Sequence, residues 1–154
     1  MTLISRFLGI DDIVVGLDVP DKGRALEAAA STLERNHGIS RSSVLPALWR
    51  REGVGSTGLG HGMAVPHARI GKIAEPILLV LRLKAPIEFA APDGQPVSVL
   101  FVILVPEGAT EEHLQILAGV AEKFSSKAFR DRLQAAPDAR SILGLFSEGP
   151  AATK

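Results

Sequence analysis

The side chains of this protein best suited to chemistry are its histidines. The chain has four of them and no cysteine, so it offers imidazole groups but no thiolate. Near neutral pH an imidazole can act as a nucleophile, a proton carrier or a metal ligand, since its unperturbed pKa is about 6.5. The absence of cysteine excludes disulfides, thiolate metal sites and thiol nucleophiles. The histidines stand at positions 37, 61, 67 and 113.

A glycine-rich segment precedes His67. Glycines occupy positions 53, 55, 58, 60 and 62. Such a loop can present several backbone N–H groups to an anion, although a surface turn before a strand explains the same pattern. Gly53 to Gly58 matches G-x-G-x-x-G, but it follows a predicted helix and leads into a strand, which excludes the dinucleotide fingerprint. A P-loop is excluded as well, because Leu59 follows Gly58 where that motif requires lysine.

The specific signal is the order of residues from Glu52 to Ala68. An acidic residue is followed, after a fixed gap, by an aliphatic and a small residue, and then by aliphatic-Ala-aliphatic-Pro-His and a small residue. The residues that satisfy this order are Glu52, Leu59, Gly60, Met63, Ala64, Val65, Pro66, His67 and Ala68. The segment resembles the phosphohistidine signature of type-2 enzyme IIA, the mannitol/fructose family of the bacterial phosphotransferase system. Arg-Glu followed by Gly-Ser-Thr-Gly is similar to its nitrogen-regulatory branch.

The resemblance runs from about Leu3 to Phe146 and implies roles for individual residues. His67 matches the phosphoacceptor, His113 in a His-Leu pair matches a second family histidine, and Arg51 matches an arginine beside the signature. Arg51 is then expected to hold phosphate oxygens and His113 to bond to the phosphate or fix the His67 tautomer. N–H groups from Gly60 to Gly62, including His61, are expected to cradle the phosphate. His61 stands where relatives often carry glycine or asparagine.

Composition and periodicity predict one α/β domain. Strands are expected at residues 12–19, 63–65, 77–83 and 97–105, the last apolar enough to be central. Helices are expected from about 21 to 38, 42 to 52, 110 to 124, 127 to 135 and 138 to 146, with His37 near a helix end in a capping role. The resemblance implies a three-layer α/β/α sandwich with a small mixed sheet. The domain is expected to span residues 1–148, followed by a frayed tail at 149–154.

Charge and hydropathy narrow the class of protein. The 17 basic residues equal the 17 acidic ones, so bulk charge does not attract nucleic acid. The longest apolar run, residues 99–105, is far shorter than the roughly 20 residues of a bilayer span. No secretory signal is apparent, so we expect a cytoplasmic protein without membrane insertion. No cofactor and no metal are expected.

The function implied by the resemblance is that of a regulatory phosphocarrier, a phosphotransferase component with a phosphohistidine intermediate. It accepts phosphate on His67 from a histidine-type phosphocarrier protein, and its phosphorylation state controls targets such as a sensor kinase or a potassium transporter. Three alternatives remain: a sugar-uptake component that passes phosphate to a separate enzyme IIB, a binding module without phosphotransfer, and a metal hydrolase using His61, His67 and His113. Phe89 and residues 63–65 are expected either to border the contact surface or to lie in the core.

Overall fold

The computed structural model describes residues 2–148, and the predicted tail at 149–154 lies outside the described part. The first strand is separated from the others by two helices, the remaining strands follow one another directly, and three helices come last. The helical elements are α1 (Leu3–Phe7), the 3₁₀ turn η1 (Ile10–Asp12), α2 (Lys22–His37), α3 (Arg41–Val54), α4 (Glu111–Phe124), α5 (Lys127–Ala135) and α6 (Ala139–Ser147). The strands are β1 (Ile13–Leu17), β2 (Gly58–Gly60), β3 (Met63–Ala64), β4 (His67–Ile70), β5 (Ile77–Ile87) and β6 (Val97–Pro106). None of the helices in the described part is long and apolar enough to cross a membrane.

The six strands form one mixed sheet in the order β1-β5-β6-β3-β2, and β4 also pairs with β6. β1 runs parallel to β5, β5 runs antiparallel to β6, and both β3 and β4 run parallel to β6. β6 is therefore central, and its side chains are buried on both faces, as its continuous apolar sequence predicts.

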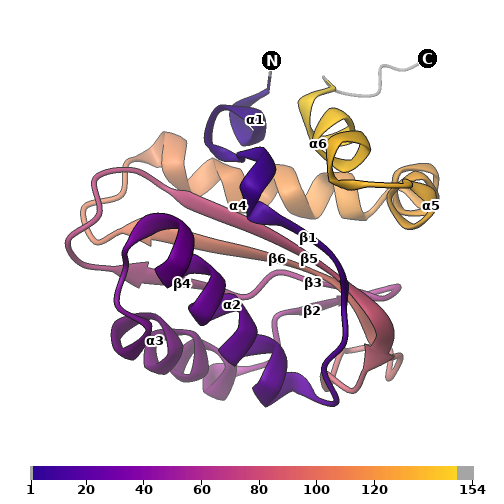
Figure 1. The fold of residues 1–154 in the computed structure, drawn as a ribbon, viewed down its shortest axis with the longest axis horizontal. Coiled ribbons are helices and arrows are strands. Elements are labelled where there is room, and N and C mark those ends of the chain that lie inside the picture. Colours follow the sequence, from indigo (N-terminus) through magenta and orange to yellow (C-terminus); the bar gives the residue numbers. More distant parts are fainter. Residues whose placement is uncertain (1, 149–154) are drawn as a thin grey trace.

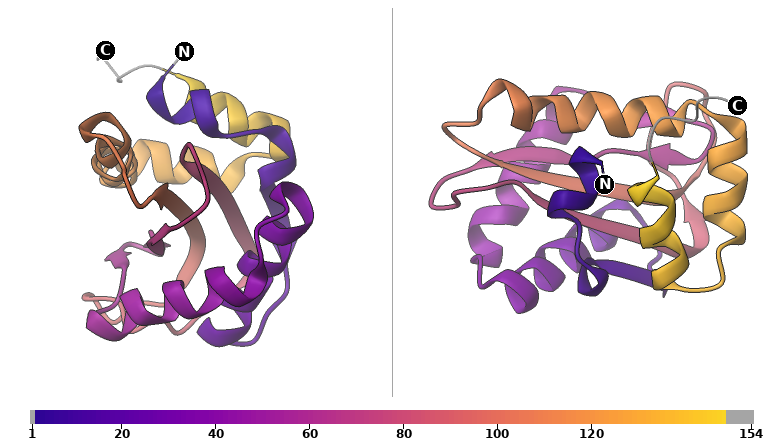
Figure 2. Two further views of the ribbon diagram at one scale, coloured as in Figure 1. Left: turned by 90° about the vertical axis from the view of Figure 1, so that its left-hand side faces the viewer. Right: turned by 90° about the horizontal axis from the view of Figure 1, so that it is seen from above.

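Helices cover both faces of the sheet and make the three-layer α/β/α sandwich that was expected (Figure 1). α2 and α3 bury a mainly aliphatic set of side chains against one face. α1, α4, α5 and α6 bury a second set against the opposite face, and this set contains four phenylalanines. Figure 2 shows the two helical layers on either side of the sheet.

Local sequence explains where the principal helices begin and end. Asp21 caps α2 by accepting a hydrogen bond from the Arg24 N–H, and Gly38 ends the helix at a φ of 72°. Thr110 caps α4, as expected from the sequence. His37, expected to cap α2, instead places its Nε2 3.0 Å from both carboxylate oxygens of Asp12.

Several boundaries differ from the expected ones. Residues 53–62, predicted as one loop, contain the end of α3 and the strand β2. His67 begins a strand rather than ending one, and α1 was not predicted because five residues carry too little periodicity to detect. α1 contacts α6, and the Thr2 hydroxyl donates a 2.7 Å hydrogen bond to the Phe146 carbonyl.

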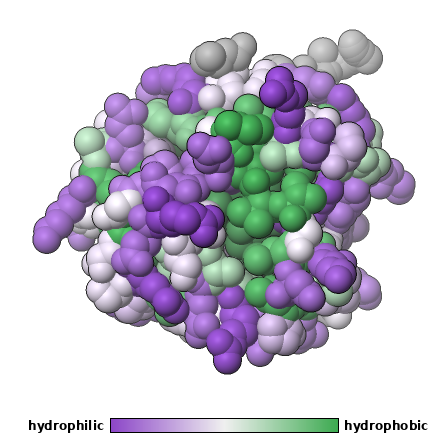
Figure 3. Space-filling view, in the orientation of Figure 1, coloured by the Kyte–Doolittle hydropathy of each residue, from purple (hydrophilic) through white to green (hydrophobic). Residues whose placement is uncertain are grey.

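One edge of the sheet leaves apolar side chains at the surface. β1 is an outer strand, and Ile10 and Val15 are 44% and 39% exposed. Figure 3 shows an apolar area on this face, over the region of β1. The glycine-rich segment and His67 belong to the opposite side of the sheet order, where β2, β3 and β4 lie beyond β6.

Candidate functional site

His67 is held at the start of β4 by its backbone neighbours. Pro66 restricts the preceding backbone, and its carbonyl accepts a 2.9 Å hydrogen bond from the Ile103 N–H. His67 then pairs in register with Ile103 of β6. Because paired residues of parallel strands point to the same face, the partly buried His67 side chain lies on the face that α4 covers.

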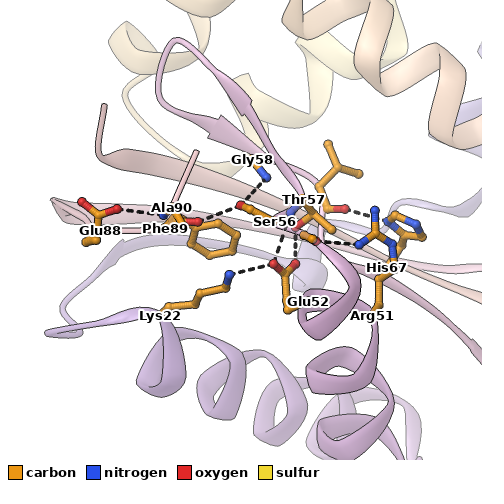
Figure 4. Close-up of polar contacts among 12 residues, drawn as sticks. Lys22, Arg51, Glu52, Ser56, Thr57, Gly58, His67, Glu88, Phe89 and Ala90 are labelled. Atoms are coloured by element: carbon orange, nitrogen blue, oxygen red, sulfur yellow. Dashed lines mark hydrogen bonds and ion pairs between the residues drawn. The ribbon is translucent and has the colours of Figure 1, made fainter. Parts of the chain in front are cut away.

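The imidazole of His67 has one nitrogen engaged. Its Nδ1 lies 2.9 Å from the carbonyl oxygen of Val65 (Figure 4). A carbonyl can only accept a hydrogen bond, so Nδ1 carries the proton and donates it. In the neutral ring this leaves the lone pair on Nε2, which is the nitrogen able to act as a nucleophile or ligand.

Arg51 approaches the site from the other helical layer. It lies in the last turn of α3, a helix that packs against β4. Its Nη1 donates a 2.7 Å hydrogen bond to the Gly55 carbonyl, which folds the side chain toward the start of the glycine-rich segment. Figure 4 draws the guanidinium and the His67 ring at the same end of this segment. The remaining guanidinium N–H groups suit the oxygens of a phosphoryl group.

His113 occupies the first turn of α4. Its N–H donates to the Thr110 hydroxyl at 3.2 Å, and its Nδ1 accepts from the Thr110 N–H at 3.4 Å, so the two residues form a capping box. The ring meets Phe7 edge-on at a centroid distance of 6.1 Å. Within residues 2–148 His113 makes no hydrogen bond to His67 or Arg51. His113 and His67 are related only in that α4 covers the face of the sheet on which the His67 side chain lies.

The predicted phosphate-cradling residues form a hairpin turn. Gly60, His61 and Gly62 have φ angles of 93°, 57° and 84°. Gly60 pairs with Met63, so His61 and Gly62 are the two central residues, and both adopt the left-handed backbone that a type I′ turn requires. The Gly62 carbonyl accepts from the Ser98 N–H at 2.8 Å, which places the turn beside the start of β6.

The turn is therefore distant from His67, which pairs with Ile103. The separation from Ser98 to Ile103 is five residues of strand, about 16 Å. The His61 N–H is also occupied, since it donates to Asp93 at 2.8 Å. This bond and one from the Gln95 N–H hold the pKa of the Asp93 carboxyl below its usual value. The structure does not bring Gly60, His61 and Gly62 to the imidazole of His67.

A buried polar network, which sequence reasoning did not anticipate, supports the same segment. Glu52 was singled out only as a position of the signature, yet its side chain is 1% exposed and lies 2.8 Å from the Lys22 ammonium. Its carboxylate also accepts from the Thr57 N–H at 3.1 Å and from the Thr57 hydroxyl. The Lys22 Nζ lies 4.3 Å from the centre of the Phe89 ring. Nothing in the sequence indicates that Glu52 is buried, because a charged residue within a helix is usually expected on its exposed face.

Phe89 and residues 63–65, which could either border a contact surface or lie in the core, lie in the core. Phe89, Met63 and Val65 are each 1% exposed, so they belong to the core rather than the surface. The apolar side chain that does stand out near Arg51 is Val54, which is 83% exposed. In the described part of the chain no group of three or more histidine or acidic side chains is placed to hold a metal ion.

Comparison with known proteins relates the whole fold to one family. Residues 6–149 match the family described as "Phosphoenolpyruvate-dependent sugar phosphotransferase system, EIIA 2". A "Nitrogen regulatory protein" of Pseudomonas aeruginosa is 44% identical over 122 residues, which cover 79% of each chain. A protein of the same name from Bradyrhizobium diazoefficiens is 34% identical over 96% of this chain and 97% of its own.

Solved structures agree with the sequence relatives. The crystal structure of nitrogen regulatory protein IIA-Ntr from Neisseria meningitidis superposes with a TM-score of 0.90 at 40% identity, covering 95% of this chain and all (100%) of that one. IIA mannitol from Escherichia coli shares the fold, with a TM-score of 0.75 at 18% identity over 91% of this chain and 99% of its own. The chain therefore belongs to the type-2 EIIA family of the phosphoenolpyruvate-dependent sugar phosphotransferase system, in its nitrogen-regulatory branch.

Proposed function

We propose that this protein is a regulatory phosphocarrier that accepts a phosphoryl group on Nε2 of His67. The donor is a phosphorylated histidine-type phosphocarrier protein, charged in turn from phosphoenolpyruvate. The observation that carries this proposal is the 2.9 Å contact between His67 Nδ1 and the Val65 carbonyl, which leaves Nε2 as the nucleophile. The proposal places the protein on the cytoplasmic side, where such a carrier is found.

The transfer step follows from this tautomer. The Nε2 lone pair forms a bond to phosphorus while the bond from phosphorus to the donor imidazole breaks. The donor ring leaves neutral and keeps the proton on its other nitrogen. His67 keeps its own proton on Nδ1 and gains positive charge in the ring, and the Val65 carbonyl oxygen faces that charge. No proton needs to leave the site during the step, which suits rapid and reversible transfer.

Positioning and charge stabilisation are the protein's main tasks in phosphoryl transfer. We assign the stabilising charge to Arg51, whose guanidinium is always protonated and bonds to the Gly55 carbonyl in the segment that leads to His67. His113 takes a second role, as a donor to the phosphoryl oxygens from the first turn of α4. We assign Gly60, His61 and Gly62 a structural role, because their turn lies beside Ser98.

The regulatory assignment is supported by relatives named "Nitrogen regulatory protein" that this chain covers over most of their length. Phosphorylation adds roughly −1.5 to −2 charge. A partner that packs over His67 would have to remove this charge from water, which is costly even where Arg51 and His113 pair with it. We therefore expect the unphosphorylated form to bind its target, such as a sensor kinase or a transporter, more tightly.

Phosphorylation with purified components tests the proposal. The protein is incubated with phosphoenolpyruvate, enzyme I and each histidine-type carrier of the same organism, and the label is followed on the protein. We expect one label, stable in alkali and lost in acid as a phosphoramidate is, and absent from His67→Ala. Label that remains on His67→Ala would overturn the assignment of the acceptor.

A matched histidine variant controls for the loss of any imidazole. His61→Asn keeps a residue that tolerates the left-handed backbone of the turn, so the fold should be retained. We expect full labelling of this variant. A large fall in its labelling rate would instead show that the Gly60–Gly62 turn takes part in phosphotransfer. Onward transfer of the label to a sugar-specific enzyme IIB would favour the sugar-uptake alternative.

A further inference from the structure

A continuous chain of contacts runs from Lys22, at the start of α2, to the ring of His67. The Lys22 ammonium lies 2.8 Å from Glu52, and Glu52 binds both the N–H and the hydroxyl of Thr57. The Thr57 carbonyl accepts from the Val65 N–H at 3.0 Å. The Val65 carbonyl then accepts from His67 Nδ1 at 2.9 Å. Figure 4 labels Lys22, Glu52, Thr57 and His67 along this path.

The location of Lys22 is not explained by the stability of its helix. It is the first residue of α2, where the helix dipole disfavours a cation. Its side chain is instead fixed from two sides, by the Glu52 carboxylate and by the face of the Phe89 ring at 4.3 Å. The main role of Lys22 is therefore to neutralise the buried Glu52 carboxylate and not to stabilise α2.

Glu52 acts on a sensitive point of the backbone. Thr57 and Val65 flank the hairpin of β2 and β3, and their mutual hydrogen bond closes its open end. A displacement of Thr57 therefore moves Val65 and, with it, the carbonyl that holds His67. A histidine without such a partner populates both neutral tautomers, and only the one protonated at Nδ1 leaves Nε2 free to react.

We propose that the Lys22–Glu52 pair is a positioning device that fixes the Val65 carbonyl and thereby selects the reactive tautomer of His67. The inference rests on the proposed phosphotransfer at Nε2. Lys22 and Glu52 do not touch the phosphoryl group. They act through Thr57 and Val65, so the rate constant of transfer depends on them while recognition of the donor protein does not.

The first test separates orientation from stability. Glu52→Gln keeps the shape of the side chain but leaves Lys22 without its charge partner. In Lys22→Met/Glu52→Gln no unpaired charge remains, so the melting temperature should largely recover. We expect the His67 tautomer and the rate of phosphotransfer to stay perturbed in the double variant. The neutral Gln and Met side chains should hold Thr57 less firmly than the charged Lys22–Glu52 pair does. Recovery of both the tautomer and the rate together with stability would overturn the proposal.

Two readouts are measured on each variant. Ring ¹⁵N chemical shifts of His67 report the tautomer and need no phosphotransfer partner. We expect Nδ1–H in the wild type and a mixture in both variants. Steady-state transfer from the phosphorylated carrier should show a kcat that is about ten- to a hundred-fold lower, as for a displaced reacting group, with KM unchanged. A raised KM at constant kcat would contradict a positioning role.

Asp12→Asn is the matched control. It weakens the contact of the buried Asp12 carboxylate with His37, which joins η1 to the end of α2 and makes no contact with the site. We expect a comparable loss of stability with an unchanged His67 tautomer and kcat. A tautomer that shifts in this variant as well would show that any destabilisation perturbs His67. If the wild type carries no label on His67, the proposed function fails, while the ¹⁵N shifts still decide whether the pair orients the ring.

Discussion

The two sides of the sheet are built by different means. On the α4 side, Phe101, Phe124, Phe129 and Phe146 cluster with ring centroids 5.1 to 6.3 Å apart, and the packing is apolar. On the α2 and α3 side the core is aliphatic, and at its margin charged and polar side chains tie Lys22, Glu52 and Thr57 together. The α4 side is packed around aromatic rings, whereas the α2 and α3 side contains the polar network that leads toward His67. Variants on the two sides should therefore differ in their free energy of unfolding and in their effect on phosphotransfer.

Phe146→Ala should cause the largest loss. The side chain is fully buried, and its ring lies 5.1 Å from Phe101 and 5.2 Å from Phe129. Removing it leaves a cavity in the phenylalanine cluster, which lowers the free energy of unfolding by about 3–5 kcal/mol. Urea unfolding gives this value. Phosphotransfer per folded molecule should be unchanged, and a specific loss of transfer would break the comparison between the two sides.

Gly58→Ala should cost less but act on the other side. A Cβ at this position would lie 2.9 Å from the Cβ and 3.0 Å from the Cα of Ala91, so the backbone must move. We expect a loss of about 1–3 kcal/mol in thermal or urea unfolding. Gly53→Ala is the control, because open space surrounds that position within α3 and alanine favours a helix. Equal destabilisation by both changes would show that the close approach to Ala91 is unimportant.

Asp93 gives a smaller effect that depends on pH. The N–H groups of His61 and Gln95 lower its pKa from 3.8 in the folded protein, so its carboxylate stabilises the fold above that value. This contribution should disappear as the pH falls below 3.8 and through the lower folded pKa. In unfolding experiments the difference between the wild type and Asp93→Asn should therefore shrink in acid. A difference that grows in acid would contradict this origin.

Arg51→Ala should change stability least. Its only described hydrogen bond is to the Gly55 carbonyl at the surface, so the change should stay within about 0.5 kcal/mol. Arg50→Ala removes the same charge from an exposed neighbour. Only Arg51→Ala should slow phosphotransfer, by at least about ten-fold if the guanidinium holds the phosphoryl oxygens. Equal rates in the two variants would remove Arg51 from the site.

Much of the fold could be predicted from local pattern. The apolar run of β6 predicted a central strand, and capping residues such as Asp21 and Thr110 predicted where helices begin. The candidate site was harder to predict from the sequence. The signature pointed to His67, but tertiary pairing decides that Gly60–Gly62 turns beside Ser98 and that Glu52 is buried against Lys22. Such contacts join residues thirty or more positions apart, and local periodicity carries no information about them.

The contact between the first and last described helices has a consequence for synthesis on the ribosome. α1 packs against α6, and the Thr2 hydroxyl donates a hydrogen bond to the Phe146 carbonyl. α1 therefore leaves the ribosome before α6 and has no complete docking surface until α6 has left the exit tunnel. Polypeptides emerge at about 5–20 residues per second. During that interval the sheet and the α2–α3 layer can assemble. The contact between α1 and α6 forms last.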